Sequence, residues 1–214
     1  MSAPLEARFF YRGARPLVLA SASPRRRALL ETVGARARVV EPRVEESAMH
    51  LEPEAAVMQH ALEKAEEVAS RAAGEALVIG ADTLVVLDRA PFGKPRDPED
   101  AVRMLLALSG REHLVMTGVA VVDARARRHR IAREITAVAM RRYDEAEARA
   151  YVATGEPLDK AGAYGIQGLG GLLVAGIRGD YANVVGLPLG LVRRLLQEIE
   201  RDAPPAAEER REDS

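Results

Sequence analysis

The chain has 214 residues, of which 48% are hydrophobic and 29% are charged, a composition typical of a globular protein with a buried core. Its 31 basic and 32 acidic residues give a formal net charge of -1, so charge alone offers no attraction to nucleic acid or to an anionic membrane. The absence of cysteine excludes disulfides, thiolate metal ligands and a cysteine nucleophile.

The two ends of the chain differ in character from its middle. Met1–Arg15 is polar and arginine-bearing, lacks the apolar core of a signal peptide, and is predicted to be a loose N-terminal extension. Residues 202–214 are charged and contain proline, which predicts a disordered tail. The predicted domain therefore spans residues 16–201. No apolar run approaches the roughly 18 residues of a membrane span, and together with the lack of cysteine this favours a cytoplasmic protein.

Residue spacing predicts alternating strands and helices along this domain. Short apolar runs indicate buried strands, and apolar residues at steps of three and four indicate helices. A polar cap followed by proline marks two helix starts, at Ser23-Pro24 and at Asp97-Pro98. In chain order we predict a strand at 16–20, a helix at 24–33, a strand at 37–40, a helix at 54–73, a strand at 76–81 that ends at Asp82, an extended run at 83–87, a helix at 98–108, strands at 114–122 and 131–140, a helix at 144–153, a glycine-rich loop at 156–171, a strand at 172–177 and a helix at 188–200.

This order predicts an α/β fold with a mixed sheet flanked by helices. The strands at 114–122 and 131–140 have no helix between them, so they are expected to pair antiparallel across the arginine-rich turn at 124–130. The arginines of that turn fit a solvated surface better than a nucleic-acid track.

Several familiar nucleotide-binding and catalytic signatures are absent. Gly93-Lys94 is followed by Pro95 and lacks the leading glycine of a P-loop, and the glycines at 165–171 lack the dinucleotide-binding spacing. The histidines show no metal-ligand spacing, and no serine sits in a nucleophile elbow.

Leu19–Arg27 (LASASPRRR) places a strand, a turn of small hydroxyl residues and a helix start in succession. Free N–H groups at that helix start, with the Ser21 and Ser23 hydroxyls and the Arg25 and Arg26 guanidinium groups, can hold phosphate oxygens. The same residues also fit a capped helix with surface arginines, so this segment alone does not decide between the two interpretations.

Gly80-Ala81-Asp82-Thr83 follows an apolar strand, which brings a carboxylate to the end of a buried run. Such a group needs a partner, and a metal ion, a lysine or a catalytic water would each satisfy it. The alternative is an aspartate that caps a turn. The functional interpretation is favoured because the extended run continues through Thr83–Leu87 instead of turning.

Three lysines are candidates for a polyphosphate site. Lys64 interrupts an otherwise apolar helix row, where it could reach a cleft or extend its ammonium into water. Lys94 is held between glycine and proline, and Lys160 opens the glycine-rich loop. Glycines in that loop permit close approach to a ligand, and the Gln167 amide could read a base edge, although a flexible surface loop is the alternative.

These residues fall within segments that resemble the Maf family of nucleoside triphosphate pyrophosphatases. The resemblance covers residues 17–196, nearly the whole chain. It rests on SASPRRRALLE, GADTLVV, GKPRDPEDAVRMLLALSGREHLVMTGVAVV, TGEPLDKAGAYGIQGLGG and DYANVVGLPLG, in this order. The resemblance implies a fold like that of the inosine triphosphate pyrophosphatases, with two lobes around a deep cleft.

The resemblance also implies the chemistry. It implies metal-dependent attack of water at the α-phosphorus of a nucleoside triphosphate, with Mg or Mn as cofactor. Asp82 matches the proton acceptor, and Glu46 matches an acidic metal partner of Asp82. The lysines that match the triphosphate and catalytic centre are Lys64, Lys94 and Lys160, and the residues that match the phosphate-holding loop are Ser21, Ser23 and Arg26.

Specificity within the family is carried by a few positions. Arg25, Thr83 and Gln167 match those of the branch that hydrolyses dTTP and UTP, with CTP and modified pyrimidine nucleotides as further candidates. The sister branch, active on 7-methyl-GTP, has a charged residue in place of this glutamine. Two alternatives stay open: that sister activity, and a nucleotide-binding regulator of septum formation. The expected partner is the substrate, without nucleic acid or membrane, and a homodimer is compatible with the sequence.

Overall fold

The computed structural model describes residues 9–44, 51–72 and 74–202. Its strands are β1 (Leu17–Ala20), β2 (Ala37–Val40), β3 (Leu77–Leu87), β4 (Ala90–Phe92), β5 (Glu112–Asp123), β6 (Arg128–Met140) and β7 (Val174–Arg178). Its helices are α2 (Pro24–Thr32), α3 (Pro53–Arg71), α4 (Pro98–Leu108), α5 (Glu145–Val152), α6 (Tyr181–Val185) and α7 (Leu189–Arg201), with 3-10 helices η1 (Glu156–Asp159), η2 (Ala161–Ala163) and η3 (Leu169–Leu173).

The strands form a seven-stranded mixed sheet in the order β2-β1-β3-β5-β6-β7, with β4 paired to the far end of β3. β1 lies parallel to β2 and β3, whereas β5, β6 and β7 add antiparallel strands. The predicted mixed sheet flanked by helices is confirmed, and so is the antiparallel pair at 114–122 and 131–140. Among the described residues, no helix is long and apolar enough to cross a membrane.

The prediction that a strand ends at Asp82 is wrong. Leu77–Val86 pairs residue by residue with β5, so the two predicted runs form one strand and Asp82 lies near its middle. β4 and α6 are too short for a periodic signal, at 3 and 5 residues, and were not predicted. The predicted glycine-rich loop contains η1 and η2 and runs into η3.

The N-terminal extension is not loose over the part that the structure describes, residues 9–15. Phe10 is only 4% exposed and belongs to the core beside α7. The Tyr11 hydroxyl donates to Glu200 at 2.5 Å, and Arg15 pairs with Asp123 at 2.6 Å. The apolar and aromatic side chains at the end of the extension explain the difference, because they can bury against the last helix. The tail at 203–214 lies outside the described residues.

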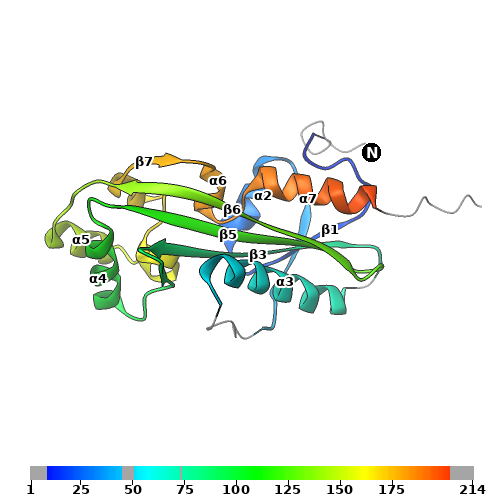
Figure 1. Ribbon diagram of the computed structural model, residues 1–214, viewed down its shortest axis with the longest axis horizontal. Helices are drawn as coiled ribbons and strands as arrows, with labels where there is room; N and C mark the ends of the chain where they lie inside the picture. Colours follow the sequence, from blue (N-terminus) through cyan, green and yellow to red (C-terminus); the bar gives the residue numbers. More distant parts are fainter. Residues whose placement is uncertain (1–8, 45–50, 73, 203–214) are drawn as a thin grey trace, which may run out of the picture.

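Two apolar cores lie toward opposite ends of the long strands (Figure 1). One joins α2 and α7 to the first half of β3. The other joins α4 and α5 to its second half. The two groups of elements form two lobes that share β3, β5 and β6.

α3 lies unusually close to the other face of the sheet. A Cβ atom on Gly80 would fall 2.1 Å from the Ala61 carbonyl oxygen, and one on Gly118 would fall 2.1 Å from the Val57 carbonyl oxygen. Only glycine therefore allows this approach. The close contact places the side chains of α3 against the middle of β3.

Candidate active site

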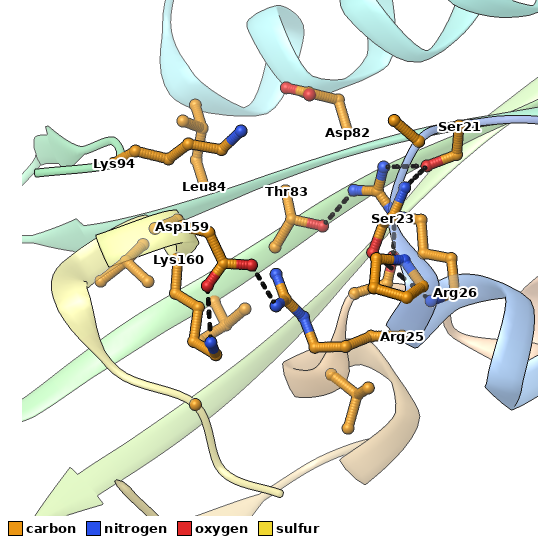
Figure 2. A pocket seen from close by; sticks show the side chains of 18 of the residues that line it. Ser21, Ser23, Arg25, Arg26, Asp82, Thr83, Leu84, Lys94, Asp159 and Lys160 are labelled. Atoms are coloured by element: carbon orange, nitrogen blue, oxygen red, sulfur yellow. Dashed lines mark hydrogen bonds and ion pairs between the residues drawn. The ribbon is translucent and has the colours of Figure 1, made fainter. Parts of the chain in front are cut away.

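Near the middle of β3 there is a break in the strand pairing along one of its two sides. On this side β1 pairs with β3 up to Gly80, and β4 pairs with β3 from Val85 onward. Among the described residues, no strand pairs with 81–84 on this side. Because successive side chains of a strand point to opposite faces, Asp82 faces α3 and Thr83 faces α2 (Figure 2). A ligand at the break can reach both.

A cleft of about 800 Å³ opens at this break and is lined from both lobes. It brings together nearly all of the predicted site residues: Ser21, Ser23, Arg25, Arg26, Lys64, Asp82, Thr83, Lys94, Lys160 and Gln167. Glu46 lies outside the residues that the structure describes. The segments that converge here are far apart in the sequence, as a site for one extended ligand requires.

The buried Asp82 carboxylate has a lysine as its partner. A lysine was one of the three kinds of partner expected from the sequence, beside a metal ion and a catalytic water. Lys64 Nζ lies 2.6 Å from Asp82 Oδ1, and His60 Nδ1 lies 3.1 Å from Oδ2. Asp82 is 8% exposed, so this ion pair is largely shielded from bulk water. Lys64 thus points into the cleft region and not into open solvent. His60 was missed, although its i, i+4 spacing from Lys64 placed both on one face of the helix.

The start of α2 is built as predicted, with Ser23 as its cap and Pro24 in the first turn. Arg26 does more than line the cleft. Its guanidinium donates to the carbonyl oxygens of Gly186 at 2.8 Å and Ala81 at 2.9 Å, and to the hydroxyls of Ser21 at 3.2 Å and Thr83 at 3.0 Å. This side chain therefore fixes the loop after β1 against β3 and the end of α6.

Arg25 and Lys160 approach each other from opposite lobes through Asp159 (Figure 2). Arg25 Nη1 lies 2.8 Å from Asp159 Oδ2, and Lys160 Nζ lies 2.6 Å from Oδ1. Burial alone would raise the pKa of Asp159, but the hydrogen bonds from Lys160 and Arg25 outweigh it and lower the pKa to about 2. The Asp159 carboxylate occupies these two cations in the way that a phosphate group would.

Glu156 organises the glycine-rich segment and was not predicted as a site residue. Its carboxylate accepts hydrogen bonds from the N–H groups of Leu169 at 2.9 Å and Gly170 at 3.1 Å, and from the Tyr151 hydroxyl at 2.8 Å. A Cβ atom on Gly168 would fall 2.4 Å from this carboxylate. The loop that carries Gln167 is therefore wrapped around one acidic side chain. Glycine at 168 is needed because a side chain there would collide with the Glu156 carboxylate.

Lys94 follows β4 and is exposed where it lines the cleft. The preceding Gly93 accepts a hydrogen bond through its carbonyl from Gly162 N–H at 3.0 Å, which ties this segment to η2. Lys94 thus extends from a backbone segment that is anchored to η2 within the same lobe.

A buried histidine supports one wall of the cleft. His113 is 2% exposed, and its Nε2 lies 2.8 Å from the hydroxyl of Tyr164, which lines the cleft. Its Nδ1 is buried without a hydrogen-bond partner. Burial lowers the pKa of His113 from 6.5 to about 4. The folded protein therefore holds this ring neutral.

We expect His113 to make the protein sensitive to mild acid. Between pH 6.5 and about pH 4 the unfolded chain binds a proton that the folded chain does not, so stability falls as the pH falls through this window. Between pH 7.5 and pH 5 the loss due to this ring is about 2 kcal/mol. Urea unfolding at both values measures it, and His113→Gln should remove most of that pH-dependent difference. An equal difference in the variant would contradict this assignment.

Within residues 9–44, 51–72 and 74–202, no group of three or more histidine, aspartate or glutamate residues is placed to hold a metal ion. Of the two predicted ligands, Asp82 lines the cleft, and Glu46 falls outside these residues. A carboxylate at the cleft still fits Mg²⁺, which is commonly held by one or two carboxylates together with the phosphate oxygens of a substrate.

Comparison with known proteins gives consistent matches over most of the chain. A family model described as Maf-like protein matches residues 16–199. A dTTP/UTP pyrophosphatase of Moorella thermoacetica is 56% identical over 181 residues, 84% of this chain and 93% of that protein. Proteins of the same name from Desulfotalea psychrophila and Gloeobacter violaceus are 51% and 52% identical, each over 96% of the relative and over 87% and 86% of this chain. A solved dITP/XTP pyrophosphatase from Mycobacterium abscessus overlaps 58% of this chain and 72% of its own, with 15% identity and a TM-score of 0.37.

Proposed function

This chain belongs to the Maf-like protein family, and we propose that it hydrolyses dTTP and UTP to the nucleoside monophosphate and pyrophosphate. It is a nucleoside triphosphate pyrophosphatase, a hydrolase that acts on a phosphoanhydride. The observation that carries the more specific proposal is the cleft that gathers Asp82 with cationic side chains from both lobes and with Thr83 and Gln167.

The reaction is the attack of a water oxygen on the α-phosphorus. A bond forms between these two atoms, and the bond from the α-phosphorus to the α,β-bridging oxygen breaks, so that pyrophosphate leaves. Asp82 orients the water and accepts its proton, which is ordinary work for a positioned carboxylate. Lys64, at 2.6 Å, holds the carboxylate in place on the α3 face of β3.

The remaining cations of the cleft bind the triphosphate. Lys94 and Lys160 supply charge to the phosphate oxygens, where it stabilises the leaving pyrophosphate. Lys160 pairs with Asp159 at 2.6 Å, and we expect substrate phosphates to replace that carboxylate as its partner. Ser21, Ser23 and the start of α2 offer hydroxyl and N–H donors to the same group.

A divalent cation, Mg or Mn, belongs to this proposal. Asp82 would hold it, with Glu46 as a second carboxylate. When bound, the cation would supply positive charge that neutralises the phosphate oxygens.

We propose that three further residues of the cleft lining read the base. Arg25, Thr83 and Gln167 line the cleft and are proposed to select a pyrimidine. An amide such as that of Gln167 carries both a donor and an acceptor, which complements the alternating N–H and carbonyl groups of uracil and thymine.

A substrate panel tests the proposed function. Pyrophosphate release is measured with Mg or Mn against dTTP, UTP, CTP, dATP, GTP and 7-methyl-GTP, and again after chelation of the metal. We expect the highest kcat/KM for dTTP and UTP and loss of turnover with chelator. A preference for 7-methyl-GTP, or release of orthophosphate in place of pyrophosphate, would reject the proposal.

Gln167→Glu is expected to weaken dTTP and UTP hydrolysis selectively. A carboxylate can only accept hydrogen bonds, so one contact to the base becomes a repulsion between acceptors, at a cost of about tenfold to a hundredfold in kcat/KM. Steady-state kinetics on UTP and GTP measure the effect. Because Gln167 is exposed, stability should not change, and an unaltered ratio between the two substrates would remove this residue from base reading.

A further inference from the structure

A row of hydrogen-bonded groups runs from the cleft into the core behind it. Thr83 Oγ1, which faces the cleft, lies 3.0 Å from Thr117 Oγ1 on the neighbouring strand β5. Thr117 Oγ1 lies 3.3 Å from the main-chain carbonyl oxygen of Asn183 in α6. Thr117 and Asn183 are both 0% exposed, and neither lines the cleft. Any influence of Thr117 on a ligand therefore passes through Thr83.

The number of hydroxyl hydrogens decides which group donates in each hydrogen bond of this row. Each threonine hydroxyl has one hydrogen, and a carbonyl can only accept. When Thr117 donates to Asn183, the bond between the two threonines takes its hydrogen from Thr83. In this arrangement of donors and acceptors, both threonine hydroxyl hydrogens have an acceptor within the protein. Thr83 then has no hydrogen left for a ligand.

Arg26 restricts Thr83 further. Arg26 Nη2 donates to Thr83 Oγ1 at 3.0 Å (Figure 2). A hydroxyl oxygen has two lone pairs, so with one used by Arg26 and its hydrogen directed to Thr117, Thr83 presents a single acceptor position to the cleft. The Thr83 hydroxyl, which could otherwise donate or accept a hydrogen bond, can thus only accept one from a ligand.

The far end of the row is firmly anchored. Asn183 Nδ2 donates to the Val115 carbonyl at 3.0 Å and to Thr136 Oγ1 at 2.9 Å, and the Asp180 carboxylate accepts from the N–H groups at the start of α6. The acceptor for Thr117 is therefore held in place by two strands and a helix cap. Rotation of Thr117 away from it would break a buried contact.

We propose that Thr117 is a positioning residue that fixes Thr83 as a hydrogen-bond acceptor toward the base, so that the cleft favours uracil and thymine over cytosine. The inference rests on the proposed function. Uracil and thymine carry an N–H group at ring position 3, whereas cytosine carries a lone pair there and would meet Thr83 acceptor against acceptor.

The decisive variant is Thr117→Val, which removes the hydroxyl and keeps the branched shape. Thr83 then regains a hydrogen that can turn to the cleft and donate to cytosine. We expect the ratio of kcat/KM for UTP over CTP to fall by about tenfold, mainly through KM. Thr117→Ser keeps the hydroxyl and is the matched control, so it should retain the wild-type ratio.

Two further measurements separate this role from a structural one. Calorimetric affinities for UMP and CMP report the preference without turnover, and urea unfolding reports stability. Thr117→Ala is prepared in parallel, so the test does not depend on the folding of the valine variant. A uniform loss on UTP and CTP with an unchanged ratio would overturn the role of Thr117 and leave the proposed function intact. A wild-type enzyme that does not prefer UTP to CTP would likewise overturn the role of Thr117 and leave the proposed function intact, whereas a wild-type enzyme that releases pyrophosphate from neither nucleotide would overturn both.

Discussion

Asp82→Asn is expected to lower kcat by about a thousandfold or more while the protein stays folded. An amide has the shape of the carboxylate but cannot accept a proton from water, and a positioned general base contributes roughly 10²–10⁴-fold. The variant should still bind nucleotide, because the cations that contact the triphosphate are unchanged. Pyrophosphate release measures turnover, and calorimetry with UTP measures binding.

A control just beyond the end of the same strand makes this result specific. Asp88 follows the end of β3, is exposed and pairs with Arg111, outside the cleft. Asp88→Asn removes the same charge and should retain full activity. Activity of Asp82→Asn within tenfold of the wild type would reject Asp82 as the base. A variant that is inactive and also unfolded would show instead that the pair with Lys64 acts on stability.

Gly118→Ala is expected to be the most destabilising single-methyl change in the sheet and to damage the site from a distance. The added Cβ would meet the Val57 carbonyl oxygen at 2.1 Å and Met58 N at 2.6 Å, both atoms of the α3 backbone. Since backbone cannot rotate away, α3 must move by about 1 Å. We expect a stability loss of about 3 kcal/mol.

The same displacement separates Lys64 and His60 from Asp82. Misplacement of a catalytic group by about 1 Å can cost roughly a hundredfold in rate, so kcat should fall in the molecules that remain folded. Urea unfolding and steady-state kinetics below the transition measure the two effects. Gly176→Ala is the matched control, because a Cβ at that strand position meets nothing within 4 Å. Equal stability of the two variants would contradict the close packing of α3.

The sequence predicted those parts of the structure that depend on local patterns. Helix starts with a cap and a proline, such as those of α2 and α4, lie where they were expected, because the capping groups are neighbours in the chain. Lys64 was predicted as a site residue from its place in a helix row, and Asp82 from the apolar run that precedes it. Both signals are local and need no knowledge of the partner.

The missed features depend on contacts between distant segments. The continuity of β3 is set by its pairing with β5, which keeps the strand extended past a charged residue. Glu156 and Thr117 appear ordinary in the sequence, because their importance comes from groups brought to them by the fold. The many contacts of Arg26 have the same origin, since its partners lie on α6, β3 and the loop after β1.

The alternation along β3 limits how a protein of this kind can vary. Asp82 and Thr83 are consecutive and project from different faces of the strand, and in the proposed function each serves a different half of the ligand. Inserting or deleting one residue ahead of them would exchange the two projections and disable both halves together. Single substitutions at neighbouring positions do not change the face of the strand from which each of these two side chains projects. We therefore expect natural variants to differ in length at the connections around β3 and to keep the spacing within it.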